Sequence, residues 1–145
     1  MVVTVKEGKE IIYIPKTFPT NTTIIFFQGS EIWHLEKTSF SGLLKLKYLD
    51  LTRNHIFRVD DDAFSDAVAL ETLDCSFNLM KEIPSSALAS LFQLTTLYLQ
   101  ENDIEELPNK GFNGLSRLKI LDLSKNRIKW LFPKTFAGLS SLEIL

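Results

Sequence analysis

Apolar residues recur along the chain with a period of 24 residues. Four full units align when the sequence is written in blocks of that length: 46–69, 70–93, 94–117 and 118–141. The first, fourth and sixth positions of each unit are apolar and the ninth is asparagine, as with Leu46, Leu49, Leu51 and Asn54. A self-similar period of this length indicates a stack of repeated coils, whatever the local propensities are.

The chain also continues the pattern on both sides of these four units. Residues 22–45 form a degenerate unit, in which Ile25 and Phe27 take the fourth and sixth positions and Ser30 replaces the asparagine. At the other end, residues 142–145 begin a further unit. We therefore divide the chain into a segment 1–21, five repeats and a partial sixth repeat.

Each half of a unit predicts a different local structure. The alternating apolar residues of the first half predict a short strand with one face turned inward, and successive strands are expected to pair in parallel. The asparagine can donate and accept hydrogen bonds, so stacked asparagines are expected to satisfy the turns that follow the strands. In the second half, Phe64 and Phe112 stand among turn-forming residues, which indicates irregular or short helical segments.

The two ends of the stack need cover because a bare coil exposes its apolar core to water. Residues 1–21 are expected to form the N-terminal cap, with 3–5 and 11–14 as a β-hairpin around the turn at 7–9. No similar cover follows the last repeat, where Leu142 and Leu145 are left bare. We expect either a truncated chain or association with a partner through this C-terminal edge.

The motif L-x-x-L-x-L-x-x-N-x-I, repeated in consecutive units, is the leucine-rich-repeat pattern. With its phenylalanine column, the chain resembles the extracellular class of these proteins, which includes Toll-like receptor ectodomains, small proteoglycans and variable lymphocyte receptors. The stretch 14–23 is similar to the proline-flanked lead-in to the first repeat of Toll-like receptors. This resemblance implies an α/β solenoid shaped as a horseshoe, with a parallel concave β-sheet. It also implies an extracellular or cell-surface location.

Composition removes several other classes of protein. Leucine supplies 23 of 145 residues, most of them in the repeat columns. The net charge of −2 gives no field to hold nucleic acid or an anionic membrane, and no apolar run is long enough to span a bilayer. The single cysteine cannot form an internal disulfide, so the core must supply the stability.

Side chains that point outward from the strands form the one surface whose geometry the repeat guarantees. Aromatic residues on this concave face are the best candidates for binding energy in protein recognition. Strands also favour aromatic residues for their own sake, and that alternative remains open. The predicted partner-binding residues are Phe26, Tyr48, Asp50, Arg53, Asp74, Phe77, Tyr98, Glu101 and Lys125.

Catalysis is not expected from these residues. Asp50 and Asp74 start about 4.8 Å apart on adjacent strands, near the carboxylate separation of retaining glycosidases. Aspartate is, however, common in this repeat column and is expected to face open solvent, whereas a catalytic pair needs a desolvated pocket. Cys75 replaces an inward leucine and is expected to be buried and inert. No catalytic, metal or cofactor motif occurs, and Asn21 is a glycosylation candidate.

Three hypotheses about function follow. The first is a non-catalytic recognition module, resembling the N-terminal part of a Toll-like receptor ectodomain, that binds a protein ligand or co-receptor in innate immunity. The second is a structural or engineered repeat scaffold that associates through its C-terminal edge, which the absence of cap cysteines favours. The third, an enzyme using Asp50 and Asp74, is the weakest. Neither nucleic acid nor membrane contact is expected.

Overall fold

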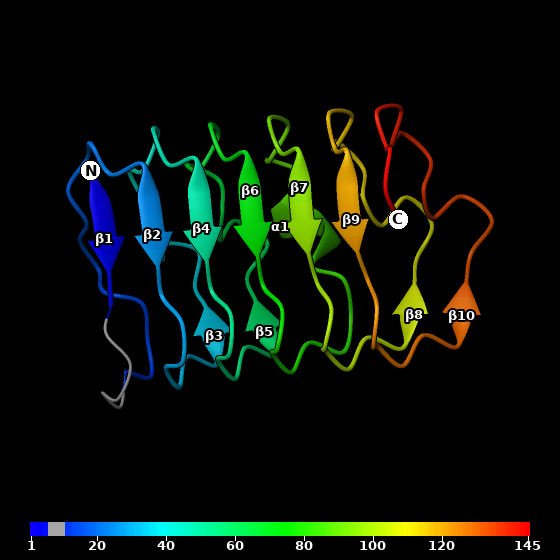
Figure 1. Cartoon of the computed structure of the whole chain (residues 1–145), viewed down its shortest axis with the longest axis horizontal. Coiled ribbons are helices and arrows are strands. Elements are labelled where there is room, and N and C mark those ends of the chain that lie inside the picture. Colours follow the sequence, from blue (N-terminus) through cyan, green and yellow to red (C-terminus); the bar gives the residue numbers. More distant parts are fainter. Residues whose placement is uncertain (6–10) are drawn as a thin grey trace.

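The chain winds into a solenoid whose coils each contribute one strand to a long parallel sheet (Figure 1). The structure is a computed structural model that describes residues 1–5 and 11–145. The strands of the sheet, in spatial order, are β1 (Val2–Thr4), β2 (Ile24–Phe26), β4 (Tyr48–Asp50), β6 (Thr72–Asp74), β7 (Thr96–Tyr98) and β9 (Ile120–Asp122). The predicted parallel sheet of a repeat solenoid is confirmed.

Register follows the 24-residue period without a slip. Leu49 pairs with Ile25 on one side and with Leu73 on the other, and the ladder continues through Leu97 to Leu121. All five side chains are buried, because the middle residue of each strand points into the coil. The neighbouring positions on either side point outward, so the repeat fixes which residues form the sheet face.

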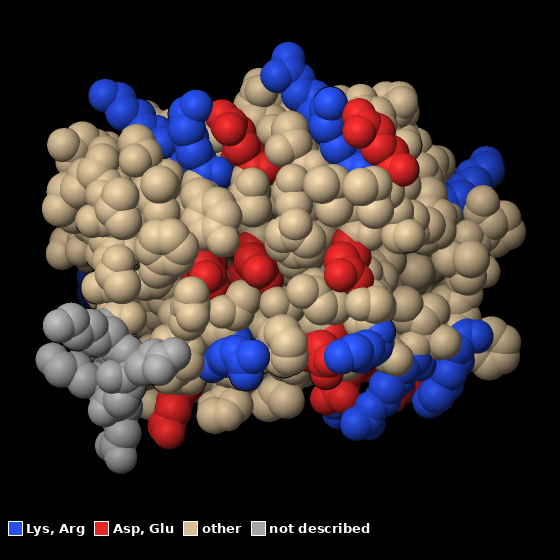
Figure 2. Space-filling model, in the orientation of Figure 1, with Lys and Arg blue, Asp and Glu red and all other residues tan. Residues whose placement is uncertain are grey.

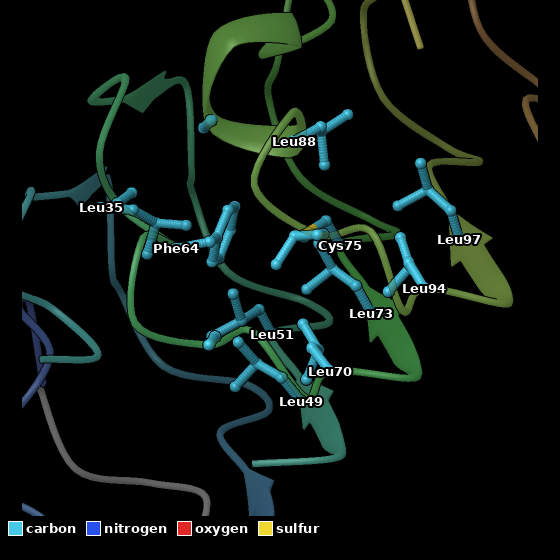
Figure 3. Close-up of a cluster of buried hydrophobic side chains, with 14 of the residues drawn as sticks. Leu35, Leu49, Leu51, Phe64, Leu70, Leu73, Cys75, Leu88, Leu94 and Leu97 are labelled. Atoms are coloured by element: carbon cyan, nitrogen blue, oxygen red, sulfur yellow. The ribbon is translucent and has the colours of Figure 1, made fainter. Parts of the chain in front are cut away.

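Leucine columns fill the space behind the sheet, and Cys75 lies among them (Figure 3). Cys75 is buried, as predicted, and burial raises the pKa of its thiol far above the usual range, which disfavours the reactive thiolate. Phenylalanines fill the wider half of the coils: the rings of Phe40 and Phe64 stack with centroids 5.7 Å apart. Burying each such side chain contributes about 1.5–3 kcal/mol.

The asparagine column forms the expected ladder. Asn78 Nδ2 donates to the carbonyls of Leu51, Cys75 and Ser76, and its Oδ1 accepts from the backbone N–H of Ile56. Asn54, Asn102 and Asn126 repeat these contacts with their own neighbours. Each amide therefore ties the turn of one coil to the coil before it, which removes unsatisfied polar groups from the interior.

The side of the solenoid opposite the main sheet, which we call the convex side, consists mainly of turns. Its one α-helix among the described residues, α1 (Ser85–Leu88), has four residues and lies behind the main sheet (Figure 1). Two short parallel ladders, which the sequence did not predict, join neighbouring coils. They pair β3 (His34–Leu35) with β5 (Arg58–Val59), and β8 (Glu106–Leu107) with β10 (Trp130–Leu131).

The prediction of an N-terminal hairpin is wrong. Strand β1 pairs in parallel with β2, and residues 11–14 form no strand. The Ile11 carbonyl accepts from the N–H of Glu31 in the way that the Ile32 carbonyl accepts from His55, so the segment continues the contacts of a coil. Parallel pairing wins because it extends the same ladder that joins the coils. The turn predicted at 7–9 lies outside the described residues.

Burial declines in the last repeat. Ile128 occupies a column that is buried in earlier coils, and Leu131 a column that is buried or half-buried there, yet they are 37% and 61% exposed. In this chain no complete coil packs against Ile128 and Leu131, so these side chains stay partly exposed although they occupy core columns of the repeat.

Candidate functional site

The sheet face carries two rows of outward side chains, one on each side of the buried middle residues. Phe26, Asp50, Asp74, Tyr98 and Asp122 form one row, because these residues are neighbours in the strand register. Tyr48 lies in the other row, and its ring is tilted against that of Phe26 with centroids 5.5 Å apart. Phe26, Tyr48 and Tyr98 are half-buried, so part of each ring faces solvent.

The aspartates of this face do not lie open to solvent, contrary to the expectation from sequence. Asp50 is 5% exposed, and it accepts hydrogen bonds from Gln28 Nε2 at 2.7 Å and from the N–H of Thr52. Asp74 is half-buried and accepts from the N–H and Oγ of Ser76. Both carboxylates close the turn after their strand, which the residue column alone could not reveal.

Burial also changes the electrostatics of this row. Desolvation raises the pKa of Asp74, and the neighbouring carboxylates of Asp50 and Asp122 add to the rise, although the hydrogen bonds from Ser76 oppose it. Burial raises the pKa of the Tyr48 hydroxyl, with Asp50 and Asp74 contributing. The middle of the sheet face is therefore a partly desolvated acidic strip between aromatic rings.

A third row of side chains lies just beyond the strand ends. Arg53, Phe77, Glu101 and Lys125 all have left-handed backbone, with φ between 53° and 56°. The guanidinium of Arg53 lies 4.5 Å from the ring centroid of Phe77, and Lys125 pairs with Glu101 at 2.5 Å. Because the same backbone conformation recurs in every coil, it aims these side chains in the same way. We call these four residues the edge row.

Charges of opposite sign are arranged differently across the face. Lys and Arg gather along its two long borders, whereas the charge in its middle is acidic (Figure 2). On the border that precedes the strands, Lys47 pairs with Glu71 at 2.8 Å and Lys119 with Glu143 at 3.1 Å. These exposed pairs join neighbouring coils and add little stability.

The structure brings the nine predicted partner-binding residues onto one side of the molecule. Five lie on the strands and four in the edge row, and their role in binding stays a prediction. Asn21 is exposed, so the glycosylation candidate stays open. Leu142 is half-buried against the core, whereas Leu145 is 67% exposed at the last coil.

The two carboxylates considered for catalysis from the sequence have structural partners in the turns. The carboxylates of Asp50 and Asp74 are engaged in turn hydrogen bonds, and neither lines the two cavities found at the surface. His34 bonds to Asp60 at 2.8 Å on the opposite half of the coil. In the part of the chain that the structure describes, no group of His, Cys, Asp or Glu side chains could hold a metal ion.

Sequence reasoning missed a cleft between the N-terminal segment and the first coil. It has a volume of about 460 Å³, and Tyr13, Trp33 and His34 are among its lining residues. One signal was present in the sequence. The twelfth position of the repeat is aromatic in the first two units, at Trp33 and Phe57, and charged in the next three.

Comparison with known proteins agrees with the repeat pattern. A solved structure, that of a TLR13–ssRNA13 complex, superposes with a TM-score of 0.67 at 27% identity over 87% of this chain. The chain spans 21% of the length of that receptor chain. No curated protein matches the sequence.

Among residues 1–5 and 11–145, no helix is long and apolar enough to cross a membrane. The sequence profile described as "Leucine rich repeat" matches residues 20–80 and 92–145, which is most of the chain. The chain therefore belongs to the leucine-rich repeat family.

Proposed function

We propose that the chain is the ligand-recognising part of an innate-immune receptor ectodomain, and that its sheet face binds a protein without catalysing a reaction. The aromatic side chains of that face carry the proposal. Phe26 and Tyr98 stand in a column where the other coils have aspartate, so the strand does not require an aromatic residue there. Half-buried aromatic rings lose little entropy on binding and are common anchors of protein interfaces.

A protein partner fits the charges better than a polynucleotide does. The solved relative is in complex with single-stranded RNA, but this chain covers about a fifth of that receptor. Polynucleotide binding draws its affinity from Lys and Arg that neutralise phosphates, whereas the middle of this sheet face carries Asp50, Asp74 and Asp122. A protein surface with basic side chains opposite the acidic strip and apolar groups opposite the aromatic rings would be complementary to this face. An extracellular or cell-surface location belongs to the same proposal.

The test compares wild-type protein with the triple variant Tyr48→Ala/Phe77→Ala/Tyr98→Ala. Both are immobilised and exposed to secreted proteins of the source organism, and proteins that the wild type alone retains are purified. Surface plasmon resonance then gives the Kd of each purified candidate for both proteins. We expect the triple variant to bind at least about tenfold more weakly, because anchors of this kind each contribute 1 kcal/mol or more.

A matched control is the double variant Leu44→Ala/Phe92→Ala. These side chains are 59% and 50% exposed in the turns before β4 and β7, outside the strands and the edge row. A ligand that the control variant loses as strongly as the triple variant would contradict the proposal. So would saturable binding of a labelled oligoribonucleotide that persists near physiological salt and competes with the protein ligand.

A further inference from the structure

The cleft beside the first coil has the dimensions of a small-molecule site. Its volume of about 460 Å³ lies within the range of pockets that bind drug-sized ligands. Ile12, Tyr13 and Ile14 supply one wall from the N-terminal segment, and Trp33 supplies part of the other from the first coil. Ile12, Tyr13 and Trp33 are 47%, 64% and 42% exposed, so a large apolar surface meets water at this point.

The Trp33 ring lines this cleft and is also in contact with the next coil. It stacks on Phe57, with ring centroids 5.6 Å apart and an interplanar angle of 23°. Phe57 in turn lines a separate hollow of about 270 Å³, which Trp33 does not line. Trp33 and Phe57 thus line different hollows, and stacking on Phe57 restricts the motion of the indole that lines the first.

Solenoid packing does not require these aromatic rings. Trp33 and Phe57 occupy the twelfth position of their units, where the next three units carry Lys81, Glu105 and Lys129. Those three coils are built on the same strand register and the same asparagine contacts. Charged residues are compatible with the fold at this position. The aromatic pair beside the cleft therefore indicates a role other than folding.

Polar groups in the cleft are few and balanced. The opposite charges of Lys16 and Glu36 both line it, and the hydroxyls of Thr38 and Ser39 add hydrogen-bonding capacity. The His34 ring is oriented by its hydrogen bond from Nε2 to Asp60. We propose that this cleft binds a flat, drug-sized molecule without net charge that contains an aromatic ring system of about the size of indole. Trp33 and Tyr13 would contact its ring, and the hydroxyls would contact its polar edge.

Indole itself is the probe for the test, and the chain offers an internal reference. The protein has two tryptophans, Trp33 in the cleft and Trp130 in the last coil, so a ¹H–¹⁵N spectrum contains two side-chain indole signals. We expect the Trp33 signal to shift saturably as unlabelled indole is added, while the Trp130 signal stays in place. Cyclohexanol, which is similar in size but not aromatic, should produce no saturable shift.

Two variants make the test specific. Trp33→Lys installs the residue type that the repeat tolerates at Lys81, and Tyr13→Ser removes the opposite ring from a 64% exposed position. Each should weaken indole binding at least about tenfold in saturation-transfer NMR, whereas Phe92→Lys, outside the cleft, should leave it unchanged. Circular dichroism verifies that each variant folds. Unsaturable shifts at both tryptophans, or wild-type affinity in both cleft variants, would overturn the proposal.

Discussion

Asn78 illustrates how much one side chain of this solenoid holds together. Its amide serves three carbonyls and one N–H, all in the interior, and the residue is 4% exposed. Removing it leaves these groups buried without partners, at about 1–3 kcal/mol for each unsatisfied group. We expect Asn78→Ala to lower the free energy of unfolding by about 2–4 kcal/mol, as measured by urea denaturation.

Asn126 provides the matched control for this prediction. It makes the corresponding contacts in the last full coil but is only half-buried, so water can replace the lost amide. Asn126→Ala should therefore cost about 1 kcal/mol. Equal losses in the two variants would mean that burial does not set the importance of the ladder.

Asp74 should make stability depend on pH in the opposite sense to an ordinary paired aspartate. Because burial raises its pKa in the folded state, ionised Asp74 destabilises the native protein at neutral pH. The penalty disappears as the pH falls from the raised folded-state pKa to the unfolded value of about 3.9. Asp74→Asn retains an oxygen that can accept both hydrogen bonds from Ser76. We expect this variant to be more stable than wild type at pH 7.

The measurement is chemical denaturation of both proteins at a series of pH values between 7 and the acid range. The stability advantage of Asp74→Asn should shrink as the pH falls and vanish once Asp74 is protonated in both states. Groups that are distant from Asp74 titrate alike in the two proteins. Among them is Asp60, whose pKa is lowered by its hydrogen bond to His34. An advantage that grows on acidification would contradict the raised pKa.

Residue roles could be predicted from the sequence where the repeat alone decides them. The asparagine ladder and the burial of Cys75 follow from column position. The burial of Asp50 does not, because it depends on Gln28, which reaches across from the preceding coil. A contact between particular side chains of two coils cannot be derived from the period.

Among the elements, the convex turns show how tightly neighbouring coils approach. Gly114 and Gly138 share one repeat column and both have left-handed backbone, with φ of +89° and +94°. A Cβ at 114 would lie 2.8 Å from the carbonyl oxygen of Ala89, directly after α1, whereas a Cβ at 138 meets nothing within 4 Å.

This difference predicts unequal effects of the same substitution. Gly138→Ala pays only for the left-handed conformation, about 1 kcal/mol. Gly114→Ala adds the clash with a backbone atom that cannot move aside easily, so we expect a loss of about 3 kcal/mol or more. Thermal and urea unfolding of the two variants give the comparison. Similar losses of unfolding free energy in the two variants would show that the backbone next to Gly114 moves aside easily, which would contradict this prediction.

The N-terminal segment shows why elements at an end are harder to predict than those in the middle. Two apolar runs with a glycine-containing stretch between them form a reasonable local pattern for a hairpin. The pattern of nearby residues contains no information about the unpaired edge of β2. Strand β1 pairs in parallel with that edge and so extends the main sheet. The two-stranded convex ladders were missed for a related reason. Each has two residues per strand, too few to show any periodicity.

At the scale of the whole molecule, each coil depends on its neighbours for a complete core. The sequence therefore predicted the sheet face well, since every outward position follows from the register. It did not predict the cleft beside Trp33, because that cavity depends on how residues 12–16 cross the first coil. The repeat has no counterpart for this crossing.

Exposed apolar residues of the last coil predict that this chain associates with itself. Trp130, Leu131, Ile144 and Leu145 are 66%, 61%, 57% and 67% exposed, and together they leave an apolar edge at the C-terminal coil. Sheet edges and uncovered solenoid ends readily pair with another chain. We expect sedimentation velocity to show dimers or larger species increasing with protein concentration, and Leu131→Lys/Leu145→Lys to restore the monomer. Leu44→Lys/Phe92→Lys, at exposed sites away from this edge, should associate as wild type does. A wild-type protein that stays monomeric at high concentration would exclude the edge as an association surface and leave the sheet face as the proposed site for a partner.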